Sequence, residues 1–119
     1  MNETQALVDT IILGIQEKKG HGITVVDLSE IDGAITKFFI ICEGNSPSQV
    51  EAIAGEVSDK CREKLREKPT ACVGLEQSIW VAMDYVDVMV HIFVPETREF
   101  YDLEHLWEDA KITYIEDID

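Results

Sequence analysis

Two aspartates at a predicted hairpin turn are the residues of this chain best placed for metal chemistry. Asp84 and Asp87 flank the turn at the end of a predicted strand, where two carboxylates could bind a divalent cation. The segment Gly44-Asn45-Ser46 precedes a predicted helix and could bind a phosphate at the helix N-terminus. Together these features would suit nucleotidyl transfer. However, no third carboxylate is obviously placed, and aspartates are also ordinary turn residues.

The remaining reactive side chains are scattered along the chain. His91 could act as a general base, but a histidine packed against an aromatic residue is more often structural or interfacial. Cys42, Cys61 and Cys72 are odd in number and form neither a CxxC motif nor a Cys–His metal spacing. We interpret them as small core residues of a reduced cytosolic protein. The sequence therefore predicts no catalytic residue, no metal site and no cofactor.

Residues 79–93 are predicted to form a β-hairpin whose two faces differ. If Tyr85-Val86 is a two-residue turn, Asp84 pairs with Asp87, Ala82 with Met89, and Trp80 with His91. Side chains alternate along a strand. One face then consists of Ile79, Val81, Met83, Val88, Val90 and Ile92 and belongs in a core. The other face carries Trp80, Ala82, Met89, His91, Phe93 and the two aspartates. Such a mixed face is either covered by a helix or available to a partner.

The hydrophobic pattern predicts the order helix, two strands, helix, three strands and helix. Thr4 is expected to cap the first helix, which ends near Lys19, and Ser46 to cap the second, with Pro47 at its first position. The predicted strands are 23–28, 38–42, 70–73 and the two arms of the hairpin. This order indicates a single α/β domain with one mixed sheet of about five strands flanked by helices. We assign residues 1–109 to the domain and residues 110–119, which show no clear pattern, to an acidic C-terminal tail.

The last predicted helix, from 95 to about 109, combines an apolar stripe with many acids. Its apolar residues Phe100, Leu103, Leu106 and Trp107 are spaced for one helix face. From residue 95 to the end of the chain there are nine acidic residues and two basic ones, a net charge of −7. The last helix is therefore the most acidic element of the molecule.

The whole chain of 119 residues is acidic, with 24 acidic and 10 basic residues and a formal charge of −14. This argues against free nucleic acid as a partner, because phosphate binding needs clustered lysines and arginines. A basic protein fits better, although the alternative is that acidity only maintains solubility. No signal peptide is apparent, and no apolar run is long enough for a membrane span. We therefore expect a cytoplasmic protein that does not bind membranes.

An ordered set of motifs resembles the ribosomal silencing factor family, whose members are also called Iojap-like proteins. The motifs are Phe39-Ile40-Ile41-Cys42 with Gly44 and Ser46, Gly74-Leu75-Glu76, Trp80, Asp84-Tyr85-Val86-Asp87, Val90-His91-Ile92-Phe93, and Tyr101-Asp102-Leu103-Glu104-His105-Leu106-Trp107. The resemblance covers about residues 4 to 108. The chain departs from the family in two places. The family usually has glycine at Val86, so the turn here could differ and shift the register, and it often has histidine at Val94.

The resemblance implies a nucleotidyltransferase-like fold without that activity. It implies a protein that binds the large ribosomal subunit through its fourteenth protein and sterically blocks joining of the small subunit, lowering translation when nutrients are scarce. Homodimers are implied for the free protein. Two other functions remain open. Relatives in mitochondria and chloroplasts assist assembly of the large subunit, and a nucleotidyltransferase-like enzyme is the less favoured alternative.

The expected partner-binding residues lie on the hairpin and the helix after it. They are Trp80, Asp84, Tyr85, Asp87, Met89 and His91, with Arg98 and Tyr101 as a second tier. Exposed aromatic residues and methionine beside acids are typical of an interface centre. Two alternatives are open: Trp80 could be a core residue under the last helix, and Arg98 could form an intramolecular salt bridge.

Overall fold

The computed structural model describes residues 3–118. The elements are α1 (Glu3–Glu17), β1 (His21–Asp27), β2 (Phe38–Glu43), α2 (Pro47–Leu65), β3 (Ala71–Val73), β4 (Trp80–Asp84), β5 (Val88–Phe93), α3 (Pro95–Tyr101), the 3₁₀ helix η1 (Leu103–His105) and β6 (Lys111–Tyr114). Within residues 3–118, no helix has the length and apolar character needed to cross a membrane.

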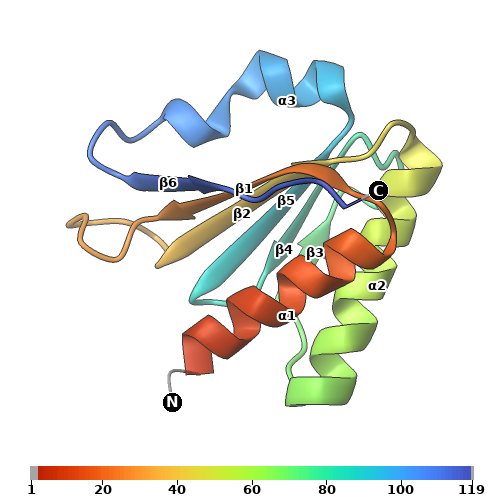
Figure 1. The fold of residues 1–119 in the computed structure, drawn as a ribbon, viewed down its shortest axis with the longest axis horizontal. Helices are drawn as coiled ribbons and strands as arrows, with labels where there is room; N and C mark the ends of the chain where they lie inside the picture. The colour runs from red at the N-terminus through yellow and green to blue at the C-terminus, as the bar shows by residue number, and fades with distance from the viewer. Residues whose placement is uncertain (1–2, 119) are drawn as a thin grey trace.

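The strands form one mixed sheet of six strands in the order β3-β4-β5-β2-β1-β6. Neighbouring strands are antiparallel, except for β2 and β5, which are parallel. α1 and α2 pack side by side on one face of the sheet, and α3 lies over the opposite face (Figure 1). The predicted α/β class and the mixed sheet are confirmed, with six strands instead of about five.

The two faces of the sheet have separate cores. On the side of α1 and α2, the core includes Ile40, Cys42 and Val90. On the side of α3, a smaller core contains Val26, Leu28, Phe39, Ile41 and Phe93. β2 contributes to both cores because its side chains alternate between the faces. This explains why the strand predicted at 38–42 is a continuous apolar run.

The two long helices begin differently from one another. α2 begins as predicted: Ser46 Oγ accepts a hydrogen bond from the Gln49 amide at 3.2 Å, and Pro47 takes the first helical position. The cap predicted for α1 is wrong, because Glu3 is already helical. The Thr4 hydroxyl donates instead to Asp87 Oδ2 at 3.3 Å and so connects α1 to the β4–β5 turn.

The last predicted helix is interrupted. α3 ends at Tyr101 because Asp102 adopts a left-handed conformation with a φ of 49°, and η1 follows. The interruption changes the direction of the side chains that were expected on one face. Leu103 and Trp107 pack against the smaller core. Phe100 and Leu106, in contrast, are 80% and 58% exposed.

The segment 110–119, assigned to a tail without clear pattern, contains the sixth strand. β6 pairs antiparallel with β1, with Ile112 opposite Val26 and Tyr114 opposite Thr24. Ile112 packs against the smaller core. Residues 111–114 therefore belong to the sheet, and the assignment of this part of the chain to a tail is corrected.

Candidate partner-binding surface

The β4–β5 hairpin reverses through a γ-turn centred on Val86. The φ of Val86 is 74°, and the Asp87 amide donates to the Tyr85 carbonyl at 2.9 Å. A positive φ is unusual for a β-branched residue and stores strain. Asp84 Oδ1 accepts a hydrogen bond from the Val86 amide at 2.8 Å and holds this conformation. Val86 thus adopts the backbone conformation that glycine favours.

This turn changes the pairing expected for the hairpin. Asp84 pairs with Met89, Ala82 with His91, and Trp80 with Phe93. The predicted pairs are therefore wrong, because each β4 residue pairs with the β5 residue two positions later than predicted. Since side chains alternate with a period of two, a shift of two leaves each residue on its predicted face. Trp80, Ala82, Asp84, Met89, His91 and Phe93 accordingly share the face toward α3.

Trp80 and His91 form the centre of an aromatic cluster on this face. The Trp80 indole N–H donates to His91 Nδ1 at 3.1 Å. Trp80 stacks on Phe93 with ring centroids 5.2 Å apart, and Phe39 meets the His91 ring edge-on at 4.8 Å. His91 is only 5% exposed, whereas Trp80 is partly exposed. His91 therefore orients the indole from beneath and does not itself face a partner.

His91 is neutral at neutral pH. Burial lowers the pKa of its imidazole to about 4. Because Nδ1 accepts the indole proton, the imidazole proton resides on Nε2. That nitrogen is buried without a hydrogen-bond partner within residues 3–118. A buried neutral imidazole of low basicity is poorly suited to general base catalysis at neutral pH.

Arg98 fastens α3 to the sheet. Its guanidinium donates to Glu104 Oε2 from Nη2 at 2.7 Å and from Nε at 3.2 Å. It also donates to the Gly22 carbonyl at 2.6 Å, to Thr24 Oγ1 at 2.9 Å and to Glu43 Oε1 at 3.2 Å. The side chain is 11% exposed. These five contacts match the five N–H donors of a guanidinium, so the intramolecular alternative for Arg98 is the one that the structure shows.

α3 places two aromatic side chains beside Trp80. The Tyr101 ring lies 4.6 Å from the Trp80 ring, and Phe100 meets Tyr101 edge-on at 5.0 Å. Tyr101 is 46% exposed and Phe100 is 80% exposed. Ring pairs of this kind hold large apolar surfaces in fixed positions. The exposed rings are therefore positioned in part by the contact of Tyr101 with Trp80.

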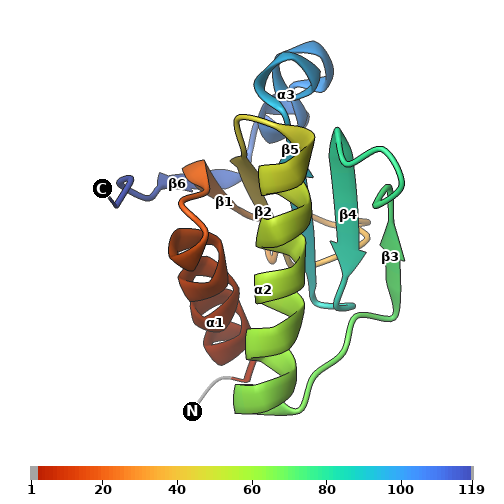
Figure 2. The same ribbon diagram turned by 90° about the vertical axis from the view of Figure 1, so that its right-hand side faces the viewer.

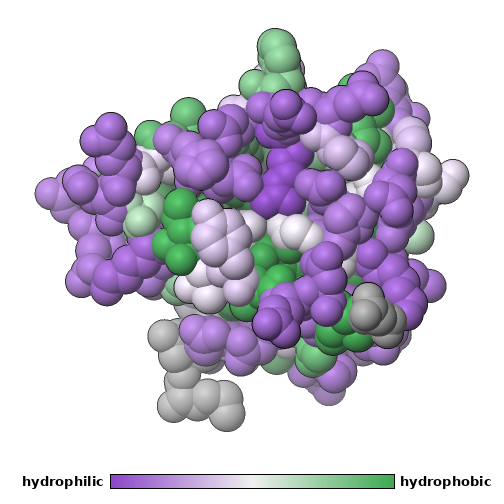
Figure 3. Space-filling view, turned by 45° about the horizontal axis from the view of Figure 1, so that its top comes forward, coloured by the Kyte–Doolittle hydropathy of each residue, from purple (hydrophilic) through white to green (hydrophobic). Residues whose placement is uncertain are grey.

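Several apolar side chains on the same side of the sheet extend this group. Val73 pairs with Ala82, which in turn pairs with His91, so Val73 and Ala82 share the face of Trp80. We define the aromatic surface as the exposed or partly exposed side chains of Val73, Trp80, Ala82, Met89, Phe100 and Tyr101. The partly exposed Asp84, which pairs with Met89, borders it. From the α3 side the molecule is mostly hydrophilic, with hydrophobic patches between polar side chains (Figure 3).

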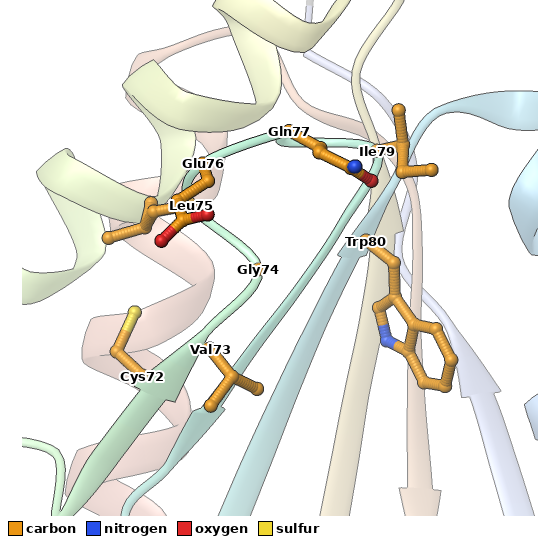
Figure 4. Close-up of a pocket in the computed structure, with 8 residues that line it drawn as sticks. All are labelled: Cys72, Val73, Gly74, Leu75, Glu76, Gln77, Ile79 and Trp80. Carbon is orange, nitrogen blue, oxygen red and sulfur yellow. The ribbon is translucent and has the colours of Figure 1, made fainter.

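A hollow of about 500 Å³ adjoins the aromatic surface. It is lined by residues 72–77, Ile79 and Trp80. Val73 and Trp80 project to one side of β3 and β4, while Cys72 and Leu75 project toward α2 (Figure 4). Gly74 has a φ of 96°, and a Cβ there would lie 2.1 Å from the Trp80 carbonyl oxygen. Only glycine permits this close crossing of the chain over β4.

The structure brings only part of the predicted binding set together. Trp80, Asp84, Met89 and Tyr101 lie on or beside the aromatic surface, and His91 lies beneath it. Three others lie elsewhere. Arg98 is committed to internal contacts. Tyr85 is 5% exposed and packs in the core on the α1–α2 side, where burial raises the pKa of its phenol. Asp87 lies at the turn, 3.7 Å from Lys37 Nζ.

Three members of the aromatic surface, Val73, Ala82 and Phe100, were absent from the predicted set. Val73 lies on an edge strand, and its place beside Ala82 depends on a pairing that the strand pattern alone does not specify. Phe100 was expected to share the apolar stripe of a continuous helix. The signal that could have identified it is Asp102, because aspartate tolerates the left-handed conformation that ends α3.

The fold and this surface define a small single-domain α/β protein with exposed aromatic side chains on an acidic molecule. Among residues 3–118, no group of three or more histidine, cysteine, aspartate or glutamate side chains is arranged to hold a metal ion. The family model described as "Ribosomal silencing factor during starvation" matches residues 1–119. The chain belongs to the ribosomal silencing factor family, and the match includes the last residues, which the sequence resemblance did not cover.

Individual relatives agree with this assignment. The chain is 36% identical over 114 residues to the ribosomal silencing factor RsfS of Halalkalibacterium halodurans, covering 96% of both chains. It is 39% identical over 75 residues to the chloroplastic protein Iojap of Zea mays, covering 63% of this chain and 32% of that one. A crystal structure of a protein from Chromobacterium violaceum superposes with a TM-score of 0.84 at 31% identity, covering 95% of this chain and 92% of that chain.

Proposed function

We propose that the protein is a cytoplasmic translational repressor that acts by occupying a ribosomal surface. In this proposal it binds the large ribosomal subunit through the subunit's fourteenth protein and sterically blocks joining of the small subunit, lowering translation under nutrient limitation. Membership of the ribosomal silencing factor family supports a ribosomal role. The observation that carries the docking site is the exposure of Phe100 and Tyr101 beside Trp80.

The composition of the aromatic surface suits a protein partner. Tyrosine, tryptophan, phenylalanine and methionine are enriched at interface centres, where a few buried aromatic side chains supply most of the binding free energy. The formal charge of −14 favours a basic ribosomal protein and disfavours the surrounding ribosomal RNA. Shape and charge together would therefore select a basic protein surface within a mostly anionic particle.

The aromatic surface is also pre-organised. The indole of Trp80 is fixed by His91, and Tyr101 belongs to the helix that Arg98 ties to β1, β2 and η1. Ordering mobile side chains on binding costs free energy, and side chains that are already fixed avoid most of that cost. The buried polar contacts below the surface thus support binding without touching the partner.

A repressor that acts by occupation needs no reacting groups. Asp84, one of the two aspartates considered for metal binding, accepts the Val86 amide. Asp87 interacts with Thr4 and Lys37. These contacts support a structural role for both carboxylates, so we propose a non-enzymatic function. The nucleotidyltransferase alternative predicts heat on calorimetric titration with ATP and Mg²⁺, whereas our proposal predicts none.

Co-sedimentation with purified large ribosomal subunits tests the docking site. Tyr101→Ala should weaken binding by about tenfold or more, which corresponds to a hot-spot residue. Tyr114→Ala is the matched control, because Tyr114 is 67% exposed and lies on β6, at the opposite edge of the sheet from β3. Near-UV circular dichroism and thermal unfolding should show both variants folded. Equal binding by Tyr101→Ala and the wild type would remove the aromatic surface from the proposal.

Subunit joining in a purified system separates repression from assembly. Adding the protein to mature large and small subunits should lower the yield of joined ribosomes, and Tyr101→Ala should lower it less. An assembly factor would have no effect on mature subunits, and a deletion strain would instead lack mature large subunits. For the free protein we propose a homodimer, as the family resemblance implies.

A further inference from the structure

The sheet has two edges at which no further strand of residues 3–118 pairs. β3 lies at one edge and β6 at the other (Figure 2). Edge strands expose unpaired backbone groups and can accept another strand, and proteins normally protect them with charges, proline or bulges. The two edges differ in how well they are protected against pairing with the same edge strand of a second copy.

The β3 edge carries no charged residue. Residues 71–77 are all exposed, and this run includes Val73 at 61% and Leu75 at 42%. The only charge in this run is Glu76, which lies beyond the strand. Hollows flank the strand on both sides: the hollow of about 500 Å³ beside Trp80, and one of about 350 Å³ between β3 and α2. Side chains of an added strand would therefore have room on either face.

When two copies of β3 are placed antiparallel, the charges that flank the strand in one copy meet charges of opposite sign in the other. Arg66, Glu67 and Lys68 precede the strand and carry a net charge of +1, and Glu76 follows it. Within the part of the chain that the structure describes, neither Lys68 nor Glu76 forms an ion pair. If two β3 strands run antiparallel about Cys72, Lys68 of one copy and Glu76 of the other lie at the same end of the paired strands. By symmetry this attraction occurs twice.

The β6 edge shows the opposite pattern. Asp109 precedes β6, and Glu116 and Asp117 follow it. In an antiparallel arrangement of two β6 strands, acids would face acids at both ends, and like charges placed opposite one another are destabilising. The charge pattern thus disfavours self-association through β6 and favours it through β3.

We propose that two copies of this chain associate through β3, with the strands antiparallel about a two-fold axis near Cys72, so that one sheet continues through both copies. This inference rests on the homodimer proposed above and names its surface. It requires no rearrangement of the aromatic rings of Trp80 or Tyr101, because the added strand lies at the edge of the sheet. The interface is isologous, as expected for a closed dimer.

Charge exchange tests the arrangement by sedimentation equilibrium. Lys68→Glu and Glu76→Lys should each raise the dimer dissociation constant by about tenfold, because each exchanges two weak attractions for two repulsions. Combining both substitutions should restore the wild-type value, which a general loss of stability would not do. Lys18→Glu is the matched control, since Lys18 is exposed, directly follows α1 and lies more than 50 positions before β3 in the sequence. A dimer that neither single variant weakens would overturn the β3 interface.

Cys72 provides a second measurement. Cys42 and Cys61 are buried as predicted, but Cys72 is exposed, so its assignment to the core is wrong. A short bismaleimide should therefore cross-link two copies at Cys72, and Cys72→Ser should abolish the product. A wild-type dimer that fails to cross-link would also overturn the β3 interface. A wild-type monomer at tens of micromolar would overturn the dimer altogether. Neither result would contradict the proposed ribosome binding, which is tested separately by co-sedimentation of Tyr101→Ala.

Discussion

Removal of the Arg98 guanidinium should destabilise the protein more than removal of any exposed arginine. Arg98→Ala deletes five hydrogen bonds and leaves Glu104, which is 9% exposed, without its cationic partner. Breaking a buried pair by removing one partner costs about 3–5 kcal/mol. The side chain of Arg98 is 11% exposed, so we expect about 3 kcal/mol. For a chain of this length the melting temperature should fall by about 12 °C.

Arg62→Ala is the matched control for this measurement. Arg62 also contacts a carboxylate, Asp59, at 3.0 Å, but its side chain is 51% exposed. An exposed pair of this kind contributes about 0.5 kcal/mol. Urea unfolding followed by circular dichroism measures both variants. If Arg98→Ala lost no more stability than Arg62→Ala, the view that Arg98 fastens α3 to the sheet would be refuted.

Three further predictions follow from single positions. The pKa of His91 is about 4 in the folded protein and about 6.5 when unfolded. Above pH 6.5 this histidine is neutral in both states, so its protonation does not lower the free energy of unfolding. Up to about 3 kcal/mol should be lost as the pH falls toward 4, and His91→Phe should flatten this loss in unfolding curves. Gly22→Ala should cost about 2 kcal/mol or more, since its Cβ would lie 2.5 Å from Arg98 Nη1 at a φ of 62°; Gly33→Ala, at a φ of 81° but in open space, should cost only about 1 kcal/mol. Gly55→Ala, in the interior of α2 with nothing within 4 Å, should raise the melting temperature through about 1 kcal/mol of added stability.

Local patterns in the sequence predicted most elements of the fold. Strand alternation assigned Trp80 and Met89 to the correct face of the sheet, and Ser46 with Pro47 marked the start of α2. The register of the hairpin was wrong because sequence preferences disfavour a positive φ at Val86. The hydrogen bond from the Val86 amide to Asp84 helps to stabilise that conformation, and residue preferences do not report such a contact.

Features that depend on distant parts of the chain were not predictable. β6 has only four residues, and its apolar contact arises from pairing with β1, which lies more than 80 positions earlier. The role of Arg98 depends on Gly22, Thr24 and Glu43, which are similarly remote in sequence. For the same reason the exposure of Phe100 could not be deduced from helical periodicity. Phe100 belongs to the aromatic surface and Arg98 supports that surface from within, so the surface was predicted less completely than the fold.

His91, Cys42 and Arg98, three groups with chemical potential, are each buried or held by contacts within the protein. His91 is neutral and accepts the indole proton of Trp80. The Cys42 thiol is buried, which raises its pKa to about 12 and leaves it un-ionised at neutral pH. The N–H donors of the Arg98 guanidinium all bind acceptors within the chain. The exposed face is left with aromatic rings held in place and a surrounding excess of negative charge. Such a face can bind by shape and charge, which is all that a steric block of subunit joining requires.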